Sequence, residues 1–169
     1  MLIRSGRRLR RRSLRLGGLL LGMLLLLPVQ VQAQSLLEAA RADGHYHWFL
    51  RAVHETRLEQ SLAELPAVTL LAPTDAAFEA MDEQERRKLF SLRNRDRLLD
   101  VLNLHVIERA VTLDQALEAG MLGSRQGQAL HFVRRSGVIG VNGAHITGKV
   151  ADTPQGRLFG LDRVLLPTL

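Results

Sequence analysis

The stretch "VTLLAPTDAAFEAM", residues 68–81, contains the signals that decide the fold. Its first part, with the alanine before it, is a β-branched and leucine-rich run of strand length, residues 67–72. Pro73 fixes its own φ and cannot donate a backbone hydrogen bond, so it stops the strand from continuing. The sequence therefore predicts a buried strand that ends at Pro73.

The residues after Pro73 are those of a helix start. Thr74 is of the type that caps a helix through its side-chain oxygen, and Asp75 suits the positive end of the helix dipole. Phe78 and Met81 fall three residues apart, on a face that can turn to the core. No base or nucleophile lies nearby in sequence, so we interpret this stretch as a structural joint rather than a catalytic Thr/Asp pair.

The rest of the first half reads as helices. A helix over 35–44 is expected, with Ser35 as N-cap, Glu38 completing a capping box and Gly44 as the stop. Apolar spacing and helix-forming residues predict further helices over 45–56, 57–65, 82–90 and 94–105.

The second half reads as strands. Short apolar runs alternate with turn signals at Gln126-Gly127, Ser136-Gly137, Asn142-Gly143 and Gln155-Gly156. Asn142-Gly143 is the strongest hairpin signal, because both residues tolerate the positive φ of a primed turn. The pattern predicts an antiparallel meander or sandwich and an α+β fold class.

The first 33 residues have the features of a secretory signal. Seven arginines lie in residues 1–16, a leucine-rich run follows, and Val31 and Ala33 suit a cleavage site after Ala33. An uncleaved N-terminal anchor is the alternative.

All 17 acidic residues lie after Ala33, whereas only 16 of the 23 basic residues do, so the mature chain 34–169 carries a net charge of −1. The basic character therefore belongs to the leader and does not indicate nucleic-acid binding. The mature chain, which has no cysteine, fits one domain without disulfides.

Three segments together resemble the fasciclin domain family. "TLLAPTDAAFEAM" resembles its first signature, "LLDVLNLHVIERAVT" (98–112) its central segment, and 141–167, from "VNGAHI" to "GRLFGLDRVLLP", its second signature. The resemblance implies a compact wedge of β-strands with helices packed over one side. It also implies adhesion or recognition outside the cell or at its envelope, rather than catalysis.

Two positions depart from the family pattern. Leu104 stands where the family usually has a tyrosine before His105, and Lys149-Val150 stands where an Asp-Ile pair is usual. A receptor contact implicated near that pair in animal members is therefore not carried over.

His105 lies on the apolar face of its helix, and we expect it to brace the joint through Thr74 or a nearby backbone group.

Six histidines raise a metal-binding alternative. His45 and His47 could chelate if the backbone were extended there, but catalytic zinc needs three protein ligands. Nucleotide-binding and serine-hydrolase motifs do not occur in the sequence.

We therefore expect a signal peptide over 1–33 and a fasciclin-like domain over 34–169, in which antiparallel β-sandwich strands carry helices over one side. The expected function is that of an exported, non-catalytic module, periplasmic or secreted, that binds a protein or polysaccharide as a monomer. We expect no cofactor, no metal, no nucleic acid and no membrane span after signal removal. The alternatives are an envelope metal-binding protein or enzyme using His45, His47 or His105, and a small-ligand or lipid carrier. The residues expected to form the structural motif are Pro73, Thr74, Asp75, Phe78, His105, Asn142, Gly143 and Asp162.

Overall fold

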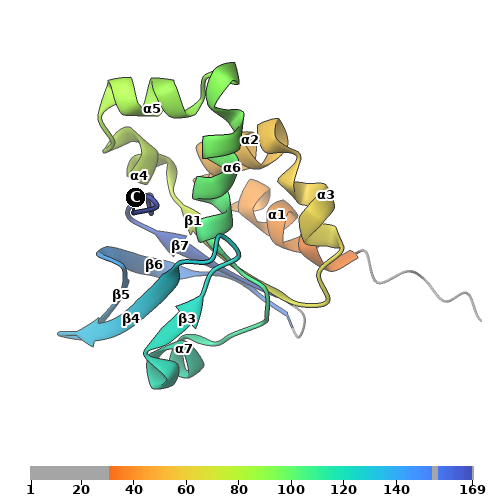
Figure 1. The fold of residues 1–169 in the computed structure, drawn as a ribbon. Helices are drawn as coiled ribbons and strands as arrows, with labels where there is room; N and C mark the ends of the chain where they lie inside the picture. Colours follow the sequence, from red (N-terminus) through yellow and green to blue (C-terminus); the bar gives the residue numbers. More distant parts are fainter. Residues whose placement is uncertain (1–30, 154–155, 169) are drawn as a thin grey trace, which may run out of the picture.

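The computed structural model describes residues 31–153 and 156–168 (Figure 1). The helices are α1 Val31–Asp43, α2 His47–Thr56, α3 Leu58–Ala63, α4 Asp75–Glu79, α5 Glu83–Leu89, the 3₁₀ turn η1 Leu92–Asn94, α6 Arg95–Leu104 and α7 Leu113–Ala119. The strands are β1 Val68–Pro73, β2 Val106–Ile107, β3 Met121–Gly123, β4 Ala129–Arg135, β5 Val138–Val141, β6 Ala144–Asp152 and β7 Gly156–Leu161. Most of the predicted leader, and Gln155 of the last turn signal, lie outside the described residues. Within those residues, every helix is too short or too polar to span a bilayer.

The seven strands form one mixed sheet in the order β2-β1-β7-β6-β5-β4-β3. Neighbouring strands pair antiparallel, except β1 and β7, which run parallel from Val68 opposite Gly156 to Pro73 opposite Leu161. The α+β class is confirmed, but the expected purely antiparallel pairing does not hold at this pair. Strands so distant in the chain need no hairpin between them, so they are free to pair in parallel. Both strands therefore end at the same edge of the sheet.

Two apolar clusters fill the two faces of the central strands. The first packs α1, α2, α3 and α6 against alternate β1 residues such as Leu70, and Figure 1 shows these helices gathered over one side of the sheet. The second combines Leu71 with residues of both end strands, Ile107 of β2 and Leu122 of β3, and with Ala116 of α7. One cluster can draw on both ends of a sheet only if the sheet curls around it. The sheet is accordingly nearly closed, and β1 is buried along its whole length.

The start of α1 differs from the sequence-based expectation. The helix already includes Val31, the first described residue, so Ser35 lies inside it, and the predicted N-cap at Ser35 is wrong. No proline or glycine interrupts residues 31–43, and their glutamines and alanines favour helix, so the helix extends upstream of the serine. It ends where predicted, before Gly44, whose φ is 81°. The predicted cleavage site, Val31 to Ala33, falls in its first turn.

We expect Gly160→Ala to lower the free energy of unfolding by about 1–3 kcal/mol, because the site has no room for a methyl group. A Cβ on Gly160 would lie 2.5 Å from the Tyr46 hydroxyl oxygen and would also meet the Thr147 hydroxyl. Gly148, its cross-strand partner, has nothing within 4 Å of such a Cβ and supplies the matched control, Gly148→Ala. Urea denaturation measures both variants. Equal stabilities would contradict the packing of Tyr46 over β7.

Candidate functional site

The joint after β1 is capped by Thr74. Its backbone is extended, with φ −68° and ψ 166°, and its hydroxyl oxygen accepts a hydrogen bond from Ala77 N–H at 3.2 Å. Thr74 N–H donates to the Leu161 carbonyl oxygen at 3.0 Å, which ties the joint to the end of β7. Pro73 is the last residue of β1. The hydroxyl of Thr74 therefore serves the helix start.

Asp75 reaches a different helix from its own. Its Oδ1 accepts from Trp48 N–H at 2.9 Å, and its Oδ2 lies 2.8 Å from His47 Nδ1. Its own N–H donates to the His45 carbonyl oxygen at 2.8 Å. Helix α2 has no cap from its N-cap residue Tyr46, so the Asp75 carboxylate takes that role from 27 residues away.

Asp162 repeats this arrangement one residue after β7. It exchanges backbone and side-chain bonds with His145 on β6: His145 N–H donates to Oδ1 at 2.6 Å, and His145 Nδ1 lies 2.8 Å from Oδ2. Asp162 N–H donates in return to the His145 carbonyl oxygen at 3.1 Å. The parallel pairing of β1 and β7 thus brings two aspartate–histidine clamps, Asp75–His47 and Asp162–His145, to one edge of the sheet.

Both aspartates are held ionised. Desolvation acts to raise the pKa of Asp75, but the hydrogen bonds from Trp48 N–H and His47 outweigh it, and the pKa lies below its usual value. At Asp162 desolvation is again outweighed, by the bonds from His145, and the pKa is likewise lowered. A lowered carboxylate pKa stabilises the fold above the usual pKa of 3.8, and that contribution is lost as the pH falls toward the folded-state value.

A hollow of about 520 Å³ lies between α4 and the segment after β7. Small residues, Ala77 and Ala80, line its helix side, and Arg163 and Val164 line the other. Asp162 also lines it, but both carboxylate oxygens of that residue are bound to His145. The hollow thus offers a contact surface without a free acid or base pair.

Phe78 anchors an aromatic cluster beneath the joint. Its ring lies 5.9 Å from that of Phe90 and 6.4 Å from that of Trp48, centroid to centroid. The guanidinium of Arg86 lies 5.5 Å from the Trp48 ring, and its Nη1 donates to the Phe78 carbonyl oxygen at 3.0 Å. Phe78 is fully buried, so its role is packing.

His105 is buried, and its ring bonds to backbone groups rather than to Thr74. Its Nδ1 lies 2.7 Å from the Val101 carbonyl oxygen, and its Nε2 accepts from Leu165 N–H at 3.0 Å. Of the two kinds of partner expected for the ring, Thr74 is wrong, because both ring nitrogens bond to backbone groups, those of Val101 and Leu165. His105 ties the end of α6 to the C-terminal segment, and Leu104 beside it is buried in the second apolar cluster.

Asn142 and Gly143 form the two-residue turn between β5 and β6, with φ values of 45° and 84°. The Asn142 side chain also bonds to β4. Its Oδ1 accepts from His131 N–H at 2.8 Å, and its Nδ2 donates to the Ala129 carbonyl oxygen at 3.0 Å. Asn142 therefore sets the turn and also holds the neighbouring strand.

Two histidines of the metal alternative, His45 and His47, are engaged by carboxylates, whereas His105 is engaged by backbone groups. His45 Nδ1 lies 2.9 Å from Asp43 Oδ1, and this hydrogen bond, with the charge of Asp43, raises the pKa of His45. His47 is held by Asp75, as described above. Within residues 31–153 and 156–168, no three histidine, cysteine, aspartate or glutamate side chains lie close enough together to hold one metal ion.

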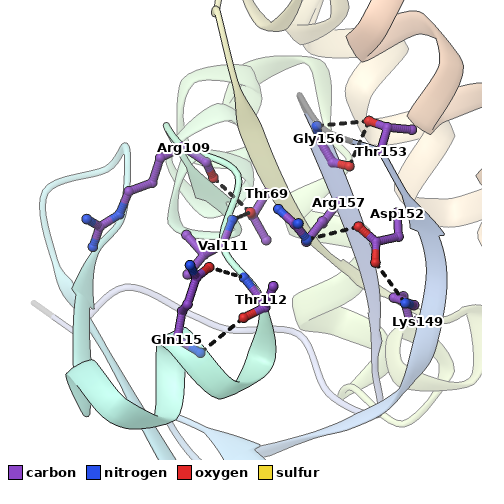
Figure 2. A network of polar contacts seen from close by, with 10 residues as sticks. All are labelled: Thr69, Arg109, Val111, Thr112, Gln115, Lys149, Asp152, Thr153, Gly156 and Arg157. Carbon is purple, nitrogen blue, oxygen red and sulfur yellow. Dashed lines mark hydrogen bonds and ion pairs between the residues drawn. The ribbon is translucent and has the colours of Figure 1, made fainter.

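Lys149, at the departure from the family pattern, belongs to an ion cluster at the opposite end of the sheet (Figure 2). Lys149 Nζ lies 2.8 Å from Asp152 Oδ2, and Arg157 Nε lies 3.0 Å from Asp152 Oδ1. The hydrogen bond from Lys149 and the two positive charges lower the pKa of Asp152. Nearby, the buried hydroxyl of Thr69 donates to the Arg109 carbonyl oxygen and accepts from Val111 N–H.

Three partners of the motif residues escaped the sequence reasoning: Trp48, His145 and Leu165. Two of them contribute only a backbone N–H to Asp75 or His105, and a backbone group leaves no mark in the sequence. His145 does have a distinctive side chain, but its link to Asp162 depends on the pairing of β6 with β7. Only the strand order could have revealed it.

Comparison with known proteins agrees with this architecture. A sequence model of the Fasciclin domain matches residues 44–167. The chain is 28% identical over 137 residues to Protein sll1483 of Synechocystis, covering 81% of this chain and 76% of that protein. It is 26% identical to the transforming growth factor-beta-induced protein ig-h3 of rabbit, covering 79% of this chain but only 19% of that protein. A solved domain pair from the insect cell adhesion molecule Fasciclin I superposes with a TM-score of 0.58 at 20% identity, covering 73% of this chain and 46% of that one.

Asp75→Ala should lower the free energy of unfolding by about 1–3 kcal/mol, because it leaves the first turn of α2 without an acceptor. His47→Ala, which removes only the exposed ring from the same clamp, should cost less than about 1 kcal/mol. Chemical denaturation at neutral pH compares the two variants. If they cost the same, the ring and not Trp48 N–H is the main partner of Asp75.

The pH dependence of stability should carry a component from His105. Burial lowers its pKa to about 4 against the usual 6.5, although the bond to the Val101 carbonyl acts in the opposite sense. The neutral ring therefore stabilises the fold above pH 6.5, and this stability is lost as the pH falls toward about 4. We expect the wild type to lose about 2–3 kcal/mol more than His105→Gln across this range.

Denaturant titrations at several pH values measure this difference, and a matching pH dependence in the two proteins would contradict it. If His105→Gln does not fold, nitrogen NMR of the wild-type ring gives the same answer. The ring should stay neutral well below pH 6.5, with its proton on Nδ1.

Proposed function

The chain belongs to the fasciclin domain family, and from that premise we propose that it is an exported, non-catalytic adhesion or recognition module. Its place of action is the cell envelope or the outside of the cell, and its partner is a protein or a polysaccharide. One similar protein of known structure, the insect protein Fasciclin I, is a cell adhesion molecule. The chain spans about a fifth of ig-h3 and about half of the solved chain. An adhesion role for this chain is therefore our proposal.

One observation supports a non-catalytic role: the polar motif residues form hydrogen bonds within the fold. Thr74 caps α4, Asp75 caps α2, His105 joins α6 to the C-terminal segment, and Asp162 holds β6. A nucleophile or general base needs a free reactive atom beside a substrate. These residues instead present a fixed scaffold whose remaining surface is available for contact.

Export rests on the N-terminal sequence. The basic segment, the leucine-rich run and the exit at Val31 and Ala33 have the order of a secretory signal. The absence of cysteine from the whole sequence means that the domain folds without disulfide formation in an oxidising compartment.

Expression of the full chain with a C-terminal tag tests export. We expect a product cut after Ala33 in the periplasm or the medium, and Leu25→Arg, which breaks the apolar run, should remain uncut inside the cell. Mass spectrometry of cell fractions measures the cut site. Full-length wild-type protein confined to the cytoplasm would contradict the proposal.

Capture from envelope extract by the immobilised mature domain tests recognition. We expect saturable retention of a defined protein or polysaccharide, and metal analysis of the same purified domain provides the opposing result. Stoichiometric zinc or copper that is lost in His45→Ala and His47→Ala would support the metal-binding alternative instead.

A further inference from the structure

The sheet has one part that helices leave uncovered. Helices α1, α2, α3 and α6 lie over the side formed by β1 and β7, whereas the far ends of β4 and β5 project away from them (Figure 1). Leu130 and Phe132 of β4 point to the second apolar cluster, so the alternate residues His131, Val133 and Arg135 face outward. This outward side of β3 to β6 is termed the hairpin face.

Exposed apolar side chains gather on the hairpin face. Met121, Val133 and Val138 are each roughly half exposed, and they account for three of the five large hydrophobic side chains exposed in the described residues. Met121 lies opposite His131, two residues from Val133, and Val138 lies two residues from Gly140, the partner of Val133. They are therefore neighbours on one surface, and clustered exposed apolar groups are typical of contact sites.

A groove of about 310 Å³ crosses this face. Gly140, which is buried, lines it between Val133 and His145, and a Cβ there would lie 3.2 Å from the Ala144 carbonyl oxygen, 3.7 Å from Val133 Cγ2 and 3.8 Å from His145 Cδ2. Arg135 and Val138 line the end nearest the hairpin tip. The groove therefore lies between side chains of adjacent strands, and Val133 and Val138 offer it apolar walls for contact with a partner side chain.

The charge of the groove is positive. Arg135 is exposed and, in the part of the chain that the structure describes, forms no ion pair. Its neighbour Arg134 points to the other side, where it pairs with Asp114 of α7 at 3.2 Å. No carboxylate lines the groove, and the carboxylate of Asp162, which contacts the lining residue His145, is engaged by that contact. An acidic partner therefore meets an unpaired cation without competition.

We propose that the hairpin face binds an acidic polypeptide segment that carries aliphatic side chains. An aliphatic side chain fits between Val133 and Val138, and a carboxylate beside it pairs with Arg135. A sugar would set its hydroxyl groups against the two valines, where they would lack hydrogen-bond partners, so a polypeptide is the better fit. This inference rests on the proposed recognition function and names the surface and the partner chemistry.

Selection of a displayed library of random short peptides on the immobilised mature domain tests the proposal. We expect enrichment of peptides in which Asp or Glu flanks Val, Leu or Ile, with affinity that weakens as salt increases. Arg135→Gln should weaken the best synthetic peptide by about threefold to fivefold, and Val138→Ser should weaken it by a similar factor. Arg134→Gln removes the same charge from the opposite side and is the matched control, with unchanged affinity.

Several outcomes would overturn the proposal: no enrichment, enriched peptides without acidic residues, or equal effects of Arg135→Gln and Arg134→Gln. Binding of polygalacturonate with the expected sensitivity to Arg135→Gln, when no peptide binds, would assign the face to an acidic polysaccharide instead. If the partner captured from envelope extract binds Arg135→Gln as well as wild type, the hairpin face is excluded and the recognition function stands. Failure of that capture and of export would remove the function itself.

Discussion

The carboxylate of Asp75 is the contact on which the arrangement of the helices depends. It follows a strand buried on both faces, and it accepts the first free N–H of a helix 27 residues earlier in the chain. Thr74, one residue before, bonds at once to the end of β7 and to the start of α4. Strands β1 and β7 and helices α2 and α4 are thus linked through two consecutive residues, Thr74 and Asp75. The position of each element restricts the positions of the others.

The parallel pairing of β1 with β7 explains why the same chemistry occurs twice. Because the two strands end side by side, each chain segment must leave the sheet at the same edge, where backbone N–H groups would otherwise lack partners. An aspartate solves this problem after each strand, and a histidine closes each clamp. The pair at Asp162 involves adjacent strands, whereas the pair at Asp75 joins strand to helix, so the two clamps fix different layers of the fold.

Local chemistry was predictable from the sequence, and remote pairing was not. The cap at Thr74 joins residues three apart, and the turn at Asn142-Gly143 needs only two adjacent residues that tolerate positive φ. The partner of His105 lies 60 residues away and offers a backbone N–H, which any residue type but proline supplies. The cap predicted at Ser35 fails for a related reason: Ser35 has a capping side chain, but residues 31–34 hold no proline or glycine and are already helical. Sequence patterns therefore identify the polar groups that need hydrogen-bond partners. The identity of a distant partner depends on the topology of the fold.

The division of the sheet into a covered and an uncovered part separates the residues that stabilise the fold from those proposed to bind a partner. In β4, Leu130 and Phe132 fix the strand against the second cluster, and the Asn142 amide holds its backbone. Val133 and Arg135, which follow Phe132 and face outward, contribute to neither contact. Substitutions on the hairpin face can therefore alter partner chemistry at little cost in folding free energy, whereas β1, buried on both faces, has no such freedom. Because the motif residues form bonds within the fold, the proposed binding function leaves specificity to a face such as this one.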